Sequence, residues 1–337
     1  MSTLLSVRKL VTSFRTDEGV VRAVDGVSFD IPRRGVLGLT GESGCGKTVT
    51  ALSVMRLVAA PGEIESGEVL YDGRDLLQLS EREMLPIRGR KMAMIFQEPM
   101  ASLNPVYTIG NQIAEVVRVH QKLARDDARQ KAIEILRLVG TASAEARFDF
   151  YPHQLSGGMR QRVAIAMALA CEPELLIVDE PTASLDVTSQ AHIFDVLRKL
   201  RDQRDMSVLL VTHDLGVLAE FAEQLLVMHA GRVVERGPVR EILSRPKHPY
   251  TEALLRSIPP LDRSRPLRGA ERPSRLATVA GMMPELSKVP MGCTFRERCS
   301  YVEARCHETE PELLEVEPTA AEKRQSRCFF FERVGSA

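Results

Sequence analysis

Residues 36–48 read VLGLTGESGCGKT, a short apolar run that leads into the pattern G-x-x-x-x-G-K-T. The run Val36–Leu39 is typical of a buried parallel strand, and the segment 48–58 can form an amphipathic helix. In this context the glycines let successive backbone N–H groups point at a phosphate, next to the positive end of the helix. The pattern predicts a phosphate-binding loop in which Lys47 contacts the β- and γ-phosphates of a nucleotide and Thr48 binds Mg²⁺.

The composition indicates a globular chain without a strong net charge. Its 337 residues are 44% hydrophobic, and this length suggests about two domains. Lys plus Arg and Asp plus Glu both number 45, so no net field attracts nucleic acid or an anionic membrane. The N-terminus lacks the apolar core of a secretory signal, and no apolar run approaches the ~18 residues that cross a bilayer. We therefore expect a soluble or peripheral protein of the cytoplasm that binds no nucleic acid.

An aromatic residue lies in the segment ahead of the loop. Residues 4–31 contain two stretches of β-forming residues on either side of the turn-prone TDEG, which predicts strands there. Phe14 belongs to the first stretch, and its ring can stack on an adenine. It can equally be part of the core, where the aromatic residues of strands are usually buried. The residues alone leave both interpretations open.

Two carboxylates follow a buried apolar strand in LLIVDE, residues 175–180. In open α/β sheets this end of a strand faces the ligand. Asp179 is suited to hold Mg²⁺ through its water shell, and Glu180 to polarise an attacking water molecule. His213 follows another apolar run, so in a parallel sheet it would stand beside Glu180 near the γ-phosphate; a surface histidine without a role is the alternative. Asp186 lies in the turn after the two carboxylates.

Two further motifs are weaker on their own. Gln97 ends the strand-like run MAMIFQ and can approach Mg²⁺ or a water molecule, although a plain surface glutamine is also expected there. Ser156, Gly157 and Gly158 stand directly before a helix, where free N–H groups attract an anion. One active site does not need two phosphate loops. These three residues therefore either cap the helix or serve a nucleotide that is held by a different subunit.

In order and spacing, GESGCGKT, Gln97, LSGGMRQ, LLIVDE, SLD and His213 resemble the nucleotide-binding domain of ABC transporters over residues 1–245. The resemblance implies an α/β fold, a P-loop ABC ATPase domain with a mixed sheet core, an antiparallel β subdomain and a helical subdomain. It implies ATP and Mg²⁺ as cofactors, Glu180 as the base, and a membrane partner coupled through Gln97. The catalytic residues that it implies are Lys47, Gln97, Glu180 and His213. The Mg²⁺ ligands are Thr48, Gln97 and Asp179. The nucleotide-binding residues are Phe14, Gly41, Ser43, Gly44, Cys45, Gly46, Lys47, Thr48, Val49, Gln97, Asp179, Ser156, Gly157, Gly158 and Asp186.

Three longer stretches narrow the resemblance to the ATPase subunits of bacterial dipeptide and oligopeptide importers. They are FQEPMASLNPVYTIG at 96–110, YPHQLSGGMRQR at 151–162 and RPKHPYTEALL at 245–255. This likeness implies ATP-driven peptide import at the cytoplasmic face of the bacterial inner membrane. The implied partners are a second homologous ATPase subunit in a heterodimer, two membrane permeases and an extracytoplasmic solute-binding protein.

Two alternatives come from other functional classes. A soluble ABC ATPase acting on ribosomes or DNA is disfavoured, because the chain has neither an internal repeat nor sustained heptads. An iron–sulfur regulatory protein that only senses nucleotide is disfavoured by the presence of Glu180 and His213.

Residues 246–337 would form a second, irregular domain that carries four cysteines. Cys293, Cys299 and Cys306 follow the pattern C-x5-C-x6-C, and Cys328 comes 22 positions later. The spacing is looser than in zinc modules and does not match ferredoxins, so a metal site and four free thiols both stay open. Similar cysteine-bearing tails in peptide importers imply a 4Fe-4S cluster at these residues, with Zn²⁺ as the alternative.

Overall fold

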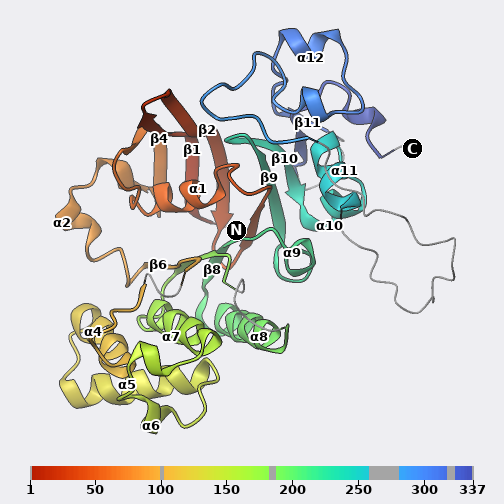
Figure 1. Ribbon diagram of the computed structural model, residues 1–337. Coiled ribbons are helices and arrows are strands. Elements are labelled where there is room, and N and C mark those ends of the chain that lie inside the picture. Colours follow the sequence, from red (N-terminus) through yellow and green to blue (C-terminus); the bar gives the residue numbers. More distant parts are fainter. Residues whose placement is uncertain (1, 99–101, 182–186, 258–280, 317–322, 336–337) are drawn as a thin grey trace, which may run out of the picture.

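The computed structural model describes residues 2–98, 102–181, 187–257, 281–316 and 323–335 (Figure 1), and the side chains of 187–189 are not described. A four-stranded antiparallel sheet is built near the start of the chain. Its strands are β1 (Thr3–Thr16), β2 (Gly19–Pro32), β4 (Gly62–Tyr71) and β5 (Arg74–Asp75), in the order β2-β1-β4-β5. On β1, Leu5 and Val7 are buried and Arg8 is exposed, as expected of a sheet with one face on the core. The predicted antiparallel subdomain is thus confirmed.

A second sheet forms the centre of the molecule, in the order β11-β12-β10-β9-β3-β8-β7-β6 within the described ranges. Its parallel strands are β3 (Val36–Thr40), β6 (Met92–Ile95), β7 (Leu175–Asp179), β8 (Ser207–Val211) and β9 (Gln224–His229). The antiparallel strands are β10 (Arg232–Pro238), β11 (Leu314–Glu315) and β12 (Gln325–Ser326). Every residue of β3, β6, β7 and β8 is buried, because both faces of the sheet are covered. Parallel pairing brings the carboxyl ends of these four strands to one edge.

Helix α1 (Lys47–Val54) begins at the glycine-rich loop and packs between the two sheets. It contacts β1 and β2 of the first sheet and β7 and β8 of the second. Its buried residues Ala51 and Val54 share a core with Leu39 of β3 and Leu209 of β8. The start of α1, and with it the loop, is therefore positioned by both sheets.

Four helices form the predicted helical subdomain, and Figure 1 shows them grouped at the end of the molecule away from α1. They are α4 (Ile109–Gln121), α5 (Arg125–Leu138), α6 (Ala144–Arg147) and α7 (Gly157–Leu169). Asp126 and Asp127 lie in the first turn of α5, near its positive end, where acidic side chains stabilise a helix. Ile113, Leu136 and Val163 join these helices in one core.

Besides the helices above, the described parts of the chain contain α2 (Glu81–Met84) and five other α-helices. They are α8 (Val187–Arg204), α9 (Leu215–Phe221), α10 (Val239–Ser244), α11 (Pro249–Arg256) and α12 (Ala304–Glu308). None of the helices in the described ranges is long and apolar enough to cross a membrane.

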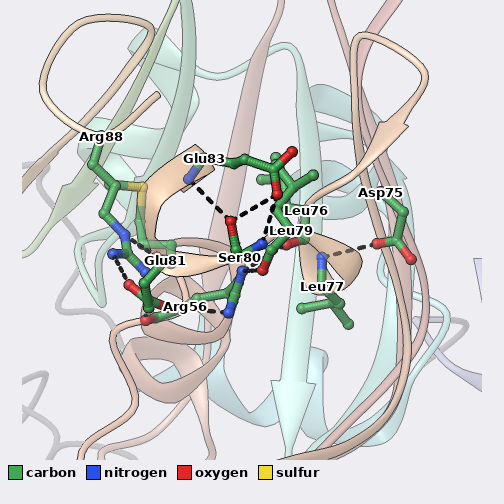
Figure 2. Close-up of polar contacts among 10 residues, drawn as sticks. Arg56, Asp75, Leu76, Leu77, Leu79, Ser80, Glu81, Glu83 and Arg88 are labelled. Atoms are coloured by element: carbon green, nitrogen blue, oxygen red, sulfur yellow. Dashed lines mark hydrogen bonds and ion pairs between the residues drawn. The ribbon is translucent and has the colours of Figure 1, made fainter. Parts of the chain in front are cut away.

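A polar cluster next to α2 (Glu81–Met84) holds the far end of α1 (Figure 2). Arg88 donates from Nε to the carbonyl oxygen of Met55 and from Nη2 to that of Arg56, each at 2.9 Å. Glu81 accepts from Arg88 at 2.8 Å and from Arg56 at 3.1 Å. Ser80 opens α2 with a capping box. The cluster satisfies carbonyl groups that a helix end leaves without partners.

The C-terminal residues continue the central sheet. The β9–β10 hairpin turns at Ala230 and Gly231, and β12 then pairs with β10. Glu235 of β10 is fully buried and accepts from Arg324 at 3.0 Å. Tyr250 also lies in the same core as the helical subdomain. A domain boundary at residue 245 stays a prediction, and these contacts cross it.

Candidate active site

The glycine-rich loop between β3 and α1 is tightly enclosed. Gly41 has a φ of +147° and Gly46 one of +104°, both in a region that disfavours side chains. A Cβ at Gly41 would lie 2.2 Å from the carbonyl oxygen of Met228, and one at Gly46 would lie 2.1 Å from that of Ala23. Neither contact is possible, so both positions require glycine. The backbone of the loop is thereby held against β9 and β2.

The lysine of the loop is buried and bonded within it. Lys47 Nζ donates to the carbonyl oxygens of Gly41 at 2.8 Å and Glu42 at 2.9 Å. Gly46 precedes α1 without a side-chain cap, so the first N–H groups of the helix have no competing side-chain acceptor. Ser43 and Gly44 are exposed at the rim. The amine and the helix start are therefore both available to a phosphate that enters across this rim.

The remaining loop positions differ in exposure. Cys45 is fully buried, and burial raises the pKa of its thiol. Val49 and Thr48 are half-buried in the first turn of α1. Cys45 thus supports the loop from the core, whereas the two residues after Lys47 remain partly accessible.

Asp179 ends β7 beside the start of α1, and its exposed fraction is 1%. Burial raises the pKa of its carboxyl group to about 6, while a hydrogen bond with Thr48 acts in the opposite direction. Asp179 Oδ1 has no hydrogen-bond partner among the described residues. A buried carboxylate oxygen without a partner, next to a threonine hydroxyl, is a donor set that suits Mg²⁺. These residues fit the predicted cation.

Three more of the predicted residues lie together, and one of them, Glu180, directly follows Asp179 in the chain. Glu180 follows β7 with a φ of +45°, and its N–H donates to the carbonyl oxygen of Val211 in β8 at 2.9 Å. Gln97, after β6, donates from Nε2 to Glu180 Oε2 at 3.1 Å. His213 Nδ1, after β8, lies 3.1 Å from Glu180 Oε1. The neighbouring strands β6, β7 and β8 therefore deliver a glutamine, a glutamate and a histidine to one point.

Other predicted residues are not joined to this group. Phe14 is half-buried on β1, opposite Gly62 of β4, so its stacking on adenine stays a prediction. Ser156 caps α7 and accepts from the N–H of Met159 at 3.4 Å. Gly157 and Gly158 begin α7, which Figure 1 shows grouped with α4, α5 and α6 away from α1. Asp186 lies outside the described residues.

Glu42 is a loop residue that the sequence reasoning missed. Its N–H donates to the hydroxyl of Tyr250 at 2.7 Å, and its carboxylate accepts two hydrogen bonds from Arg298. Only its place inside the phosphate-binding pattern could have drawn attention to it. Nothing in the sequence connects it with two residues so far along the chain.

The four C-terminal cysteines line one cavity, which Phe295 and Tyr301 also border. Burial raises the pKa of the Cys293 thiol, and it raises that of Cys299 to about 11 and that of Cys328 to about 12. However, no group of three or more His, Cys, Asp or Glu side chains in the described parts of the chain is arranged to hold a metal ion. The expected metal centre is thus not supported, and the Zn²⁺ alternative, which needs all four thiolates on one ion, disagrees with this arrangement.

Comparison with known proteins agrees with this geometry. Residues 24–183 match the family model described as "ABC transporter", and residues 234–306 match that of the "Oligopeptide/dipeptide transporter, C-terminal region". The chain is 50% identical over 316 residues to a "Probable peptide ABC transporter ATP-binding protein" of Sinorhizobium fredii, covering 94% of this chain and 92% of that protein. It is 46% identical over 339 residues to a "Putative peptide import ATP-binding protein" of Brucella ovis, covering 99% and 98%.

Solved structures of similar fold are ATP-binding cassettes. A dimeric cassette in a post-hydrolysis state, bound to ADP and Pi, has a TM-score of 0.65 and 27% identity, covering 70% of this chain and 99% of that one. The cbiO1 subunit of a Clostridium perfringens ABC transporter complex has a TM-score of 0.60 and 26% identity, covering 72% and 91%. Together with the relatives, these matches identify the chain: it belongs to the family of ATP-binding proteins of peptide ABC transporters.

Proposed function

We propose that this chain binds MgATP at residues 41–48 and hydrolyses it to drive the import of di- and oligopeptides through a membrane transporter. The observation that carries the proposal is the meeting of Glu180, Gln97 and His213 beside a buried Asp179, at the sheet edge next to the loop. That the transported substrate is a peptide is proposed from the names of the relatives.

In the proposed reaction, Glu180 accepts a proton from water as the water oxygen attacks the γ-phosphorus. The bond between that phosphorus and the leaving oxygen of ADP breaks in line with the attack. Gln97 and His213 hold the two oxygens of Glu180 and so keep the carboxylate in one orientation. Mg²⁺ bound by Asp179 and Thr48 would neutralise charge on the phosphates.

Lys47 changes partners in this scheme. Its amine is bonded to two loop carbonyl groups, and a triphosphate offers stronger, charged acceptors. Lys47 therefore turns from the carbonyls to the β- and γ-phosphates when ATP binds. Phe14, near the end of β1, would stack on the adenine.

We further propose that a second, homologous cassette completes the site. Ser156, Gly157 and Gly158 stand at the start of α7, a helix that Figure 1 shows in the helical subdomain away from α1. They would face the nucleotide of the partner. The likeness to a dimeric cassette supports this arrangement. A heterodimer with another ATPase subunit fits relatives that act as parts of a transporter.

The membrane subunits would contact the surface next to Gln97. An apolar groove there is lined by Met94, Ile95 and Phe96 of the segment before Gln97 and by Val116 and Met167 of the helical subdomain. Movement of a permease segment in this groove would displace Gln97 from Glu180. We accordingly place the chain at the cytoplasmic face of the bacterial inner membrane, with two permeases and an extracytoplasmic solute-binding protein.

The test is transport by the assembled complex. The chain is co-expressed with its candidate permeases and second ATPase subunit, and the complex is placed in liposomes with the solute-binding protein. ATP-dependent uptake of labelled di- to pentapeptides is expected. A complex that hydrolyses ATP but takes up none of these peptides would contradict the peptide as substrate, and one without ATPase activity would contradict the whole proposal.

We also propose that Cys293, Cys299, Cys306 and Cys328 hold a 4Fe-4S cluster. Support comes from their position around one cavity, because the thiolates of a cluster bind different iron atoms and need not converge on a single point. Such a cluster would fix the C-terminal segment in place. Anaerobically purified protein should contain iron and acid-labile sulfide and absorb visible light, and Cys306→Ala should lose all three signals. Colourless protein without iron would end this proposal.

A further inference from the structure

Residues beyond 245 reach back to the phosphate-binding loop at Glu42. Both terminal nitrogens of Arg298 donate to the Glu42 carboxylate, each at 2.7 Å. The side chain of Arg298 is only 4% exposed, and that of Glu42 is 26% exposed. A two-pronged pair of this kind, largely shielded from water, holds a carboxylate in one place and orientation.

The backbone of Glu42 is held by a second residue of the same region. Its N–H donates to the hydroxyl of Tyr250 at 2.7 Å. Tyr250 is fully buried, and its ring packs against His229 at the end of β9 and against Phe295. The hydroxyl is therefore a rigid acceptor, since the ring that carries it has no room to move.

The third polar group of Glu42 faces the catalytic lysine. The carbonyl oxygen of Glu42 accepts from Lys47 Nζ at 2.9 Å. When Lys47 turns toward a phosphate, this contact is lost, while the contacts from Tyr250 and Arg298 can stay. Tyr250 and Arg298 thus hold the backbone and the carboxylate of Glu42 in place while the side chain of Lys47 moves.

The C-terminal region also contacts the phosphate-binding loop at Gly44. A methyl group at Gly44 would come within 3.2 Å of Met283 Cε, so the C-terminal region covers one side of the rim. Together with the Glu42 contacts, this shows that the C-terminal region packs directly on the phosphate-binding loop.

We propose that Tyr250 and Arg298 are positioning residues of the ATP site, which set the phosphate-binding loop in its binding conformation before nucleotide arrives. The inference rests on the proposed ATPase function. It assigns to the C-terminal region a role in nucleotide affinity, because a loop that is already ordered loses less entropy on binding.

The first experiment compares Arg298→Met and Glu42→Gln with the wild-type chain in the assembled transporter. Each variant should raise the KM for ATP about tenfold and change kcat less than about twofold, because the order of the loop is lost but the catalytic carboxylate is untouched. Tyr250→Phe should raise KM about threefold, through loss of one hydrogen bond. Arg333→Met is the matched control, because Arg333 lies in the same region and pairs with Glu303 at an exposed site; its KM should equal that of the wild type.

A double variant separates positioning from general damage. If Arg298 acts through Glu42, adding Arg298→Met to Glu42→Gln should raise KM no further. Glu42→Gln leaves the C-terminal core intact, so it tests the idea even if Arg298→Met does not fold. An unchanged KM in Glu42→Gln, or effects of the two substitutions that multiply, would overturn the inference. A wild-type complex without ATPase activity would instead overturn the proposed function.

Discussion

Glu180 is held by two neighbours, and the proposed hydrolysis depends on its charge. The variant Glu180→Gln keeps the shape of the side chain and removes the proton acceptor. ATP binding should persist, while turnover falls about 10²- to 10⁴-fold. Single-turnover hydrolysis by the assembled complex measures the loss, with Glu134→Gln on the exposed face of α5 as the matched control. Normal turnover in Glu180→Gln would remove this residue from its role.

Asp179 makes stability depend on pH. Its pKa is raised from its ordinary 3.8 to about 6, so between these values the folded protein binds more protons at this site than the unfolded chain does. The free energy of unfolding therefore falls as pH rises through both values, chiefly between about pH 3 and 7, by about 3 kcal/mol in total at this site. Mg²⁺ would reverse the effect, because it stabilises the ionised form.

The variant Asp179→Asn tests this pH dependence. Without Mg²⁺ or nucleotide, the free energy of unfolding of the variant minus that of the wild type should be about 2 kcal/mol larger at pH 7 than at pH 4, because the amide has no charge to bury. Urea unfolding of both proteins at the two pH values measures it. An equal difference at both values would mean that the carboxyl group titrates normally.

Helix α1 carries the loop at one end and is fastened by Arg88 at the other (Figure 2). The variant Arg88→Met keeps the apolar stem but leaves the carbonyl groups of Met55 and Arg56 without this donor. The free energy of unfolding should fall by about 1–3 kcal/mol. Urea unfolding checks it, and Arg82→Met, at an exposed position of α2, should be neutral. If Arg88→Met and Arg82→Met lowered the free energy of unfolding equally, the effect would come from the loss of a surface charge.

The elements near the loop were predictable because their signals are local. The buried run before Gly41, the turn at Ala230 and the helix start at Ser80 each follow from a few adjacent residues. The meeting of Gln97, Glu180 and His213 could also be foreseen, since parallel strands end at one edge. By contrast, the ion pair between Glu42 and Arg298 joins residues far apart in the chain, and no local sequence pattern predicts it. Whether Ser156 serves another chain depends on a partner, which lies beyond any single sequence.

At the scale of the whole molecule, the C-terminal region and the cassette share one sheet and one core. A chain that ends at residue 245 would lose β12 from the edge of β10, and Glu235 would lose its hydrogen bonds from Lys247, His248 and Arg324. Such a chain should be insoluble or unfold without cooperativity, because the sheet edge and the apolar surface that the C-terminal region covers would be exposed. Circular dichroism during thermal unfolding measures this. Cooperative unfolding of residues 1–245 would establish the predicted domain boundary instead.

The pairing of β12 with β10 also affects how the protein is made. A ribosome releases the chain from its N-terminus, so β10 leaves the exit tunnel long before Gln325–Ser326 has been synthesised. During that interval the nascent protein exposes the edge of its largest sheet, and exposed edges pair readily with other chains. Translation that stalls shortly before residue 325 would therefore yield an aggregation-prone product even though every residue of the phosphate-binding loop is already present.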